Sequence, residues 1–327
     1  MMTAMTLEKF EEACEIVGRV TNKTGLVYSQ CFSDQCGNKV YLKPENMQKT
    51  GAFKIRGAYY KISQLSPEES AKGVIACSAG NHAQGVALAA TRMGIKSVVC
   101  MPDGAPIMKV ESTKRLGAEV ELVKGTYDDA HDRAVELQEQ TGMTFIHPYD
   151  DELVIAGQGT IGLEILDQLP DVDAVIVPIG GGGLISGVAF AIKQLKPSCK
   201  VIGVQAGVVA SMYASRQAGK VTTVPDAATL ADGIHVLTPG SLTFEMCQKY
   251  VDEIVTVSED EIAAAILALL EVQKTVAEGA GATPVAACMS GKVDTTKKTV
   301  CVVSGGNVDV TTLSRVITLS LIHISEP

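Results

Sequence analysis

The stretch VIVPIGGGGLISG, residues 175–187, decides the fold, because it joins a continuously apolar strand to a row of four glycines. Apolar residues at helical spacing follow from Leu184 onward. The stretches VIACSAGNHAQG (74–85) and VCVVSGGNVD (300–309) repeat this design of a strand that runs into a glycine-rich turn. In open parallel sheets, ligands bind beyond the carboxyl ends of the strands, so the three turns predict one shared cleft.

Short β-branched runs alternate with segments of helical periodicity along the chain. The runs expected to form strands are GVIACS (73–78), SVVCMP (97–102), AEVELV (118–123), MTFIHP (143–148), DAVIVPI (173–179), KVIGVQ (200–205), DEIVTVS (252–258) and TVCVVSG (299–305). The helices expected between them cover 81–93, 127–140, 160–169, 184–195 and, behind a capping box of Ser258 and Glu261, the segment up to about Lys274. Apolar strands that alternate with helices predict parallel sheets covered on both faces.

The positions of these strands predict an α/β fold with two domains, each built on an open, parallel sheet. Four expected strands fall between residues 73 and 150, and the others fall after 170. We therefore place a large domain at 1–70 and 152–320 and a small domain at 71–151, with the cleft between them. The final stretch SLIHISEP does not continue the preceding pattern, so residues 321–327 are expected to be a tail foreign to the native fold.

Composition and charge indicate a soluble α/β enzyme. The 327 residues are 46% hydrophobic and 20% charged, with 31 glycines, no tryptophan and a net charge of −9. The acidic balance argues against nucleic acid and anionic membranes as partners. Acidic residues near the N-terminus and the shortness of every apolar run predict a cytoplasmic protein. Nine scattered cysteines, with no CxxC pair and no histidine at ligand spacing, indicate mostly buried, reduced thiols and no metal site.

The glycine-rich turns and one lysine are the candidate functional elements. Four bare glycines before a helix allow several N–H groups to converge on one phosphate, although a tight structural turn is the alternative. The row does not fit the dinucleotide or Walker patterns, which excludes the usual nucleotide sites. The SAGNH turn opens another helix, where a carboxylate can bind. Lys54, in NMQKTGAFKIRGA (46–58), supplies an amine among small and polar residues.

A reactive lysine, a glycine turn, an asparagine turn and a serine at a strand end suit pyridoxal phosphate. The motifs KTGAFKIRGA, SAGNHAQG, GGGGL, EGAGA and SGGN have the order and spacing of the fold-type-II pyridoxal-phosphate enzymes. Among their serine/threonine dehydratases, the chain most resembles the biodegradative (catabolic) threonine dehydratases, or threonine ammonia-lyases. This resemblance, over residues 5–318, implies a tryptophan synthase β-like fold. It also implies conversion of L-threonine to 2-oxobutyrate and ammonia, with L-serine to pyruvate as a side activity.

The resemblance assigns a role to each motif. Lys54 is expected to form a Schiff base with the cofactor and to act as the catalytic base, with Phe53 beside the cofactor. Asn81 is expected to bind the ring hydroxyl, and Ser304 is expected to face the ring nitrogen. The residues expected to bind the phosphate are Gly180, Gly181, Gly182, Gly183 and Leu184. Those expected at the substrate carboxylate, largely through backbone N–H groups, are Ser78, Ala79, Asn81 and His82.

Three alternative functions remain open from the sequence. Serine racemases share nearly all of these motifs, but they carry a serine where this chain has Ala79 and a metal-binding glutamate where it has Gln205. β-Replacement synthases usually have threonine in place of His82 and aspartate in place of Ile55. A non-catalytic phosphate-binding module would keep the glycines but would not need the lysine.

The resemblance also implies assembly and regulation. Catabolic relatives form homodimers or homotetramers and can be activated allosterically by AMP, so both are expected for this chain. Arg56 is expected to fix the loop after Lys54 through backbone contacts, and Glu278, in EGAGA, is expected near the cofactor without an assigned role.

Overall fold

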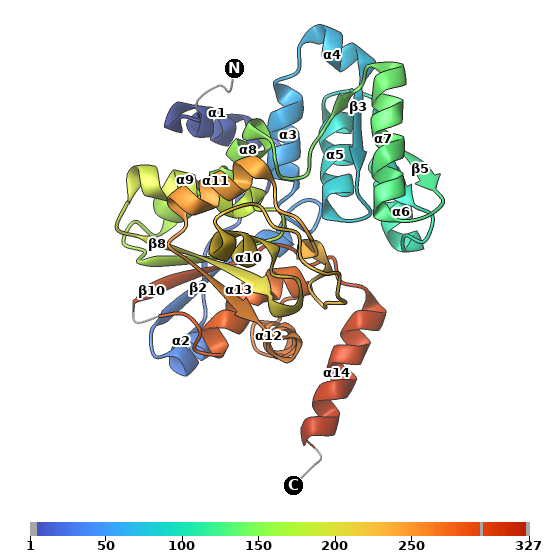
Figure 1. The fold of residues 1–327 in the computed structure, drawn as a ribbon. Coiled ribbons are helices and arrows are strands. Elements are labelled where there is room, and N and C mark those ends of the chain that lie inside the picture. The colour runs from blue at the N-terminus through green and yellow to red at the C-terminus, as the bar shows by residue number, and fades with distance from the viewer. Residues whose placement is uncertain (1–4, 295–296, 325–327) are drawn as a thin grey trace.

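The computed structural model describes residues 5–294 and 297–324 and contains two sheets, which confirms the predicted α/β class (Figure 1). The six-stranded sheet has the order β1 (Val27–Tyr28), β2 (Lys39–Pro44), β10 (Lys298–Val303), β7 (Ala174–Pro178), β8 (Lys200–Ala206) and β9 (Glu253–Val257). The four-stranded sheet has the order β5 (Glu119–Val123), β4 (Ser97–Pro102), β3 (Val74–Cys77) and β6 (Thr144–Phe145). Neighbouring strands are parallel except for the antiparallel pair β1 and β2.

Helices cover both sheets, as the sequence pattern predicts. The first part of the chain contains α1 (Leu7–Val17), α2 (Gln30–Cys36), η1 (Glu45–Met47), α3 (Ile55–Ser63), α4 (Pro67–Lys72), α5 (Asn81–Arg92), α6 (Ile107–Arg115) and α7 (Tyr127–Thr141). The second part contains α8 (Glu152–Gln168), α9 (Gly183–Leu195), η2 (Gly207–Val209), α10 (Ser211–Ala218), η3 (Asp232–Ile234), α11 (Ser241–Tyr250), α12 (Glu259–Glu271), α13 (Gly279–Met289) and α14 (Val310–Ile324). The predicted capping box of Ser258 and Glu261 is confirmed at the start of α12.

The elements form two lobes in Figure 1. We call the four-stranded sheet with α5, α6 and α7 the small lobe, and the six-stranded sheet with its helices the large lobe. The residue bounds given above for the two domains stay a prediction. Helix α14 projects away from the large lobe and continues through Ile324, so residues 321–324 of the expected tail extend a helix (Figure 1). Residues 325–327 of that tail lie outside the described residues.

Helix α8 begins at Glu152, well before residue 160, where the sequence predicted it. The glycines of α8 lower its helix propensity, so its first two turns cannot be predicted from hydrophobic periodicity. The structure shows why glycine is needed: a Cβ added to Gly157 would lie 2.7 Å from the carbonyl oxygen of Arg56. The backbone of α3 therefore packs directly on α8, and the Gly57 N–H donates to the Gln158 Oε1 at 3.0 Å. This contact fixes the helix that follows Lys54.

The remaining sequence expectations concern thiols, metals and membranes. None of the nine cysteines forms a disulfide bond. Six of them are buried: Cys77, Cys100, Cys199, Cys247, Cys288 and Cys301. The described segments contain no group of three or more His, Cys, Asp or Glu side chains that could hold a metal ion. Within residues 5–294 and 297–324, none of the helices combines the length and the apolar character that crossing a bilayer requires.

Candidate active site

Lys54 stands at the entrance to α3 as its N-cap residue. Its Nζ donates a hydrogen bond to the carbonyl oxygen of Pro148 at 2.7 Å and lies 5.3 Å from the centre of the Phe53 ring. Although part of the side chain is exposed, the surrounding protein removes water from the amine. This burial lowers the pKa of Lys54 to about 8, and the charge of Glu278 opposes the shift. A sizeable fraction of Lys54 is therefore a neutral, nucleophilic amine near neutral pH.

The small lobe brings α5 directly against Lys54. A Cβ added to Gly85 would lie 3.0 Å from the carbonyl carbon of Lys54, so the two backbones are nearly in contact. Gly85 lies about one helical turn from Asn81, which begins α5. The first N–H groups of a helix have no intrahelical acceptor, so the start of α5 offers donors and a positive dipole close to the amine.

The four-glycine turn leads from β7 into α9, which begins at Gly183. A Cβ on Gly181 would lie 2.4 Å from ring carbons of Tyr149, and one on Gly183 would lie 2.8 Å from the Cα of Tyr149. Gly182 has a φ of 99°, a left-handed conformation that side chains disfavour. Since Tyr149 directly follows Pro148, the glycine turn and the Lys54 amine contact the same short segment.

This arrangement fits the phosphate of the expected cofactor. The first N–H groups of α9, at Gly183 and Leu184, have no acceptor within their own helix, and the positive end of the helix dipole lies beside them. The glycines allow the turn to pack closely on Tyr149 and Thr243, where a Cβ would lie within 3 Å of those residues. The free N–H groups can hold a phosphate, and the assignment of Gly180 to Leu184 to that role stays a prediction.

Substituting Gly181 by alanine tests this turn. We expect the new methyl group to displace the turn or the Tyr149 ring, because it cannot stay 2.4 Å from that ring. Overpacking costs about 1–3 kcal/mol; if cofactor binding bears this cost, the dissociation constant of pyridoxal phosphate should rise about 5- to 150-fold. Titration of the apoenzyme with cofactor measures the change. Gly104→Ala is the matched control, since nothing lies within 4 Å of its added Cβ; equal affinity in both variants would contradict the assignment.

The SAGNH turn is the expected site for the substrate carboxylate. The Ser78 N–H already donates to the Cys100 carbonyl oxygen at 3.2 Å, which extends the pairing of β3 with β4. Only the Ser78 hydroxyl remains for a ligand, and it accepts the Gly80 N–H at 3.1 Å. A contact from Ser78 to the carboxylate would therefore come from its hydroxyl, and the place of Ser78 in this site stays a prediction. The N–H groups at the start of α5 remain available in the turn.

His82 contributes its backbone to that turn, while its side chain is directed to protein. The ring is buried, and its Nε2 lies 2.7 Å from the carbonyl oxygen of Ile146, so Nε2 carries the hydrogen. Burial, followed by the positive charge of Lys54, lowers the pKa of His82 to about 3. The imidazole is consequently neutral at physiological pH and adds no charge to the carboxylate site.

The SGGN turn lies next to the lysine motif. The Phe53 N–H donates to the Ser304 carbonyl oxygen at 3.0 Å, and Ala52 forms an antiparallel bridge with Gly305. Ser304 is buried. A buried, uncharged hydroxyl in the turn that binds the Phe53 N–H fits the expected contact with the cofactor ring nitrogen.

Glu278, to which the sequence assigns no role, is a buried acid that accepts a hydrogen bond from Asn81. Burial raises its pKa to about 7; the hydrogen bond from Asn81 lowers it, the charge of Asp232 raises it and that of Lys109 lowers it. Lys109, from α6 in the small lobe, forms an ion pair with Asp232 of the large lobe at 3.1 Å. The two lobes are therefore joined by charged contacts around Glu278.

Sequence reasoning missed the segment after β6 and the last residue of the SGGN motif. The His147 Nδ1 accepts N–H groups from Tyr149 at 3.2 Å and Asp150 at 2.8 Å, which fixes the turn whose Pro148 carbonyl binds Lys54. Asn307 contacts Asn81 across the site. The stretch YDDELVIAGQGTIGLEI (149–165) also matches the family, but the sequence assigns no role to its first residues, to His147 or to the asparagine of SGGN.

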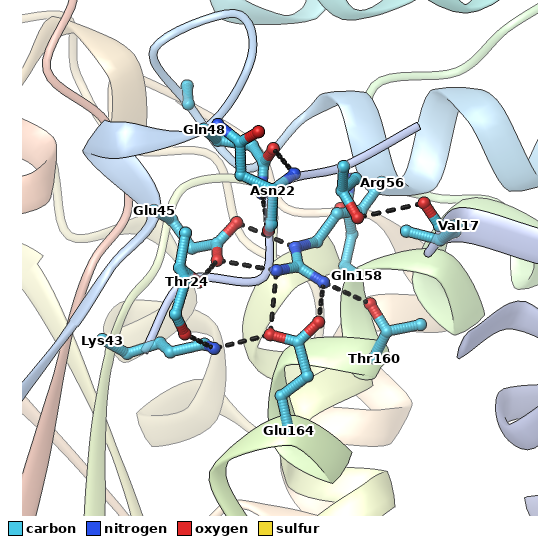
Figure 2. A network of polar contacts seen from close by, with 12 residues as sticks. Val17, Asn22, Thr24, Lys43, Glu45, Gln48, Arg56, Gln158, Thr160 and Glu164 are labelled. Atoms are coloured by element: carbon cyan, nitrogen blue, oxygen red, sulfur yellow. Dashed lines mark hydrogen bonds and ion pairs between the residues drawn. The ribbon is translucent and has the colours of Figure 1, made fainter. Parts of the chain in front are cut away.

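Arg56 lies two residues after Lys54 and is fully buried in a network of charges (Figure 2). Its guanidinium forms two hydrogen bonds with Glu45, both at 2.8 Å, and two with Glu164, at 2.7 and 3.0 Å. A fifth hydrogen bond reaches the Thr160 hydroxyl at 3.1 Å, so all five donors are used. The expectation that Arg56 acts through backbone contacts is wrong. It ties α3 to the large lobe through two carboxylates, and Lys43 binds the second of them.

Comparison with known proteins agrees with this geometry. A family model described as "Pyridoxal-phosphate dependent enzyme" matches residues 18–305. The L-threonine ammonia-lyase of Thermotoga maritima is 54% identical over 319 residues, which cover 97% of this chain and 79% of that protein. The catabolic L-threonine dehydratase TdcB of Escherichia coli K12 is 52% identical over 304 residues, 92% of each chain. The solved structure of maize serine racemase superposes with a TM-score of 0.91 at 36% identity, over 99% of this chain and 100% of that one.

Proposed function

The chain belongs to the family of pyridoxal-phosphate-dependent enzymes, and from that premise we propose that it is an L-threonine ammonia-lyase that forms 2-oxobutyrate and ammonia. Pyridoxal phosphate is its cofactor. The observation that carries the proposal is the Lys54 amine, whose pKa is lowered to about 8. The backbone of Lys54 lies against α5, and its amine binds the segment that packs on the glycine turn.

Different residues of the chain would bind different parts of the cofactor. The N–H groups at the start of α9 would bind the phosphate, the Asn81 amide would bind the ring hydroxyl, and the Ser304 hydroxyl would face the ring nitrogen. Pyridoxal phosphate, when bound, withdraws electrons from the α-carbon of an amino acid joined to it and so acidifies the α-hydrogen. Ser304 has no charge to hold a proton on the ring nitrogen, which favours prompt loss of a β-substituent.

Lys54 carries out the proton transfer in this proposal. Its Nζ takes the α-proton of the substrate in its neutral form, whose share near neutral pH is increased by the lowered pKa. The substrate carboxylate would bind the first N–H groups of α5, beside Asn81 and His82. The β-hydroxyl leaves as water, and hydrolysis of the nitrogen-bearing product consumes one water, so L-threonine gives 2-oxobutyrate and ammonia in sum.

Ala79 supports elimination over racemisation. Racemisation needs a second acid–base group on the face of the substrate opposite the lysine, and a methyl side chain has no proton to give. The sequence identities point the same way, at 54% and 52% with the two threonine enzymes and 36% with the racemase. L-serine to pyruvate is proposed as a side activity, since serine lacks only a methyl group, worth roughly 1–3 kcal/mol in a fitted pocket.

The proposal is tested by incubating the holoenzyme with L-threonine and, separately, with L-serine. We expect 2-oxobutyrate from threonine at the higher kcat/KM, pyruvate from serine, and little D-serine. Coupled reduction of the oxo acids and chiral chromatography measure the products. D-serine as the main product of L-serine would assign the chain to the racemases, and no oxo acid from either substrate would reject the lyase.

Three further features rest on the resemblance alone. We propose a cytoplasmic homodimer or homotetramer that AMP activates. Light scattering with and without AMP, combined with the threonine assay, tests assembly and activation together.

A further inference from the structure

Asn81 is hydrogen-bonded to Glu278 on one side and to Asn307 on the other. The Asn81 Nδ2 donates to the Glu278 Oε1 at 2.7 Å, and the Asn307 Nδ2 donates to the Asn81 Oδ1 at 2.7 Å. The three residues are far apart in the sequence, so only the fold brings them together.

The hydrogen bonds among Asn81, Glu278 and Asn307 join both lobes to the segment that carries Lys54. Asn81 begins α5 in the small lobe, whereas Glu278 and Asn307 belong to the large lobe. The Asn307 Nδ2 donates its second hydrogen bond to the carbonyl oxygen of Thr50 at 2.8 Å. Asn307 thus contacts the asparagine turn and the lysine motif with a single nitrogen atom.

Hydrogen-bond chemistry fixes the orientation of the Asn81 amide. The Thr50 carbonyl oxygen fixes the Asn307 Nδ2 as a donor. If the Asn81 amide turned over, its nitrogen would face this donor at 2.7 Å, and the hydrogen bond between the two asparagines would be lost. In the observed orientation one Asn81 N–H is bound by Glu278, and the second N–H is left for a ligand.

We propose that Asn307 is a positioning residue, which holds the Asn81 amide so that its free N–H faces the ring hydroxyl of the cofactor. This inference rests on the proposed role of Asn81 but does not depend on which amino acid is the substrate. An N–H favours the ionised ring oxygen, whereas an amide oxygen turned toward it would repel it. The orientation of Asn81 therefore controls the visible absorbance and the affinity of the bound cofactor.

Asn307→Asp is the most informative substitution, because it keeps the shape and exchanges the donor for an acceptor. The new carboxylate oxygen would face the Asn81 Oδ1 and the Thr50 carbonyl oxygen, both acceptors. The Asn81 amide must then turn over or move away, and its free N–H leaves the cofactor. We expect the visible absorbance to shift as it does in Asn81→Ala, and the cofactor dissociation constant to rise about tenfold.

A double-substitution cycle distinguishes positioning from a general loss of structure. If Asn307 acts through Asn81, the effect of Asn307→Asp on the spectrum and on the cofactor affinity should be much smaller once Asn81 is alanine, and what remains reports the contact with Thr50. Absorbance spectra and cofactor titrations of the four proteins measure this without any substrate. A wild-type spectrum in the Asn307→Asp variant, or its full tenfold effect in the Asn81→Ala background, would overturn the proposal.

Asn46→Asp provides the matched control. The Asn46 Nδ2 also donates to two oxygens of the large lobe, the Thr275 hydroxyl at 2.7 Å and the Val276 carbonyl at 2.9 Å, and it does not bind Asn81. We expect its spectrum to equal that of the wild type. If Asn307→Asp does not fold, Asn307→Ala removes the donor without adding repulsion and should shift the spectrum in the same direction. Failure of the threonine assay alone would leave these spectral outcomes intact, so the two proposals are tested separately.

Discussion

The Lys54→Ala variant should lose turnover of L-threonine by at least about 10³-fold, since the same side chain is proposed to bind the cofactor and to move the α-proton. The visible absorbance of the purified protein should also disappear, because alanine has no amine to join to the cofactor aldehyde. Reduction with borohydride followed by mass spectrometry should find the cofactor attached to Lys54 in the wild type and to no residue in the variant. The 2-oxobutyrate assay measures the loss of turnover.

Lys49→Ala is the control for this experiment. Lys49 lies in the same segment and is exposed, so its removal should leave both absorbance and turnover unchanged. A Lys54→Ala protein that retains visible absorbance and substantial turnover would exclude Lys54 as the cofactor-binding residue. Colourless wild-type protein that cannot be loaded with cofactor would contradict the family assignment itself.

The second large effect is expected from Arg56→Met, which leaves the buried carboxylate of Glu45 and the partly buried carboxylate of Glu164 without their main partner. Burying a charge without a partner is costly, and breaking a buried ion pair from one side typically costs about 3–5 kcal/mol. We expect the free energy of unfolding to fall by about that amount, as measured by chemical denaturation. Turnover should also decrease, because Arg56 ties the start of α3, and with it Lys54, to the large lobe.

Two further variants test whether the loss of stability in Arg56→Met comes from the unpaired buried charge. Arg133 forms ion pairs with Glu121 and Glu136 in a solvent-exposed setting, so Arg133→Met should change stability little. Combining Arg56→Met with Glu45→Met removes one of the unpaired carboxylates and leaves Lys43 bound to Glu164. The double variant should therefore be more stable than Arg56→Met alone; equal or lower stability would show that packing, not charge, decides the loss.

The pH dependence of the Arg56→Met effect follows from Glu45. Burial would raise the pKa of Glu45, but the Arg56 charge and hydrogen bonds hold it below the ordinary value of 4.5. A carboxyl with a lowered pKa stabilises the fold above its ordinary pKa and loses that contribution as the pH falls through the folded value. Without Arg56 the carboxyl should titrate higher and become neutral on acidification. The destabilisation should thus be larger at neutral pH than at acidic pH, which denaturation at several pH values measures.

The sequence predicted most of the large-scale structure because the signals involved are local. All eight expected strands are present, since continuous β-branched runs flanked by helical periodicity identify buried parallel strands. It missed β1 and β2, the second of which contains Lys43, a charged residue that is fully buried beside Glu164. It also shortened α8, because glycines that permit close packing look like helix breakers.

In the candidate site, too, the sequence identified local motifs but not the contacts between distant residues. Lys54, the glycine turn and Asn81 were identifiable because each motif is a short contiguous pattern with its own chemistry. The partners of these residues were not identifiable, since Glu278 and Asn307 meet Asn81 only through the packing of the two lobes. The partners of Arg56 could not be identified from the sequence either, because the two carboxylates that bind it come from η1 and α8.

The sequence alone therefore determined which chemical groups the protein has and the family to which it is related, because bare glycines, helix starts and a lysine are properties of neighbouring residues. Only the tertiary structure decided the state of those groups. The pKa of Lys54, the orientation of the Asn81 amide and the closed set of hydrogen bonds around Arg56 depend on burial and on partners from distant segments. Desolvation and hydrogen-bond geometry act through space, and no pattern along the chain records them.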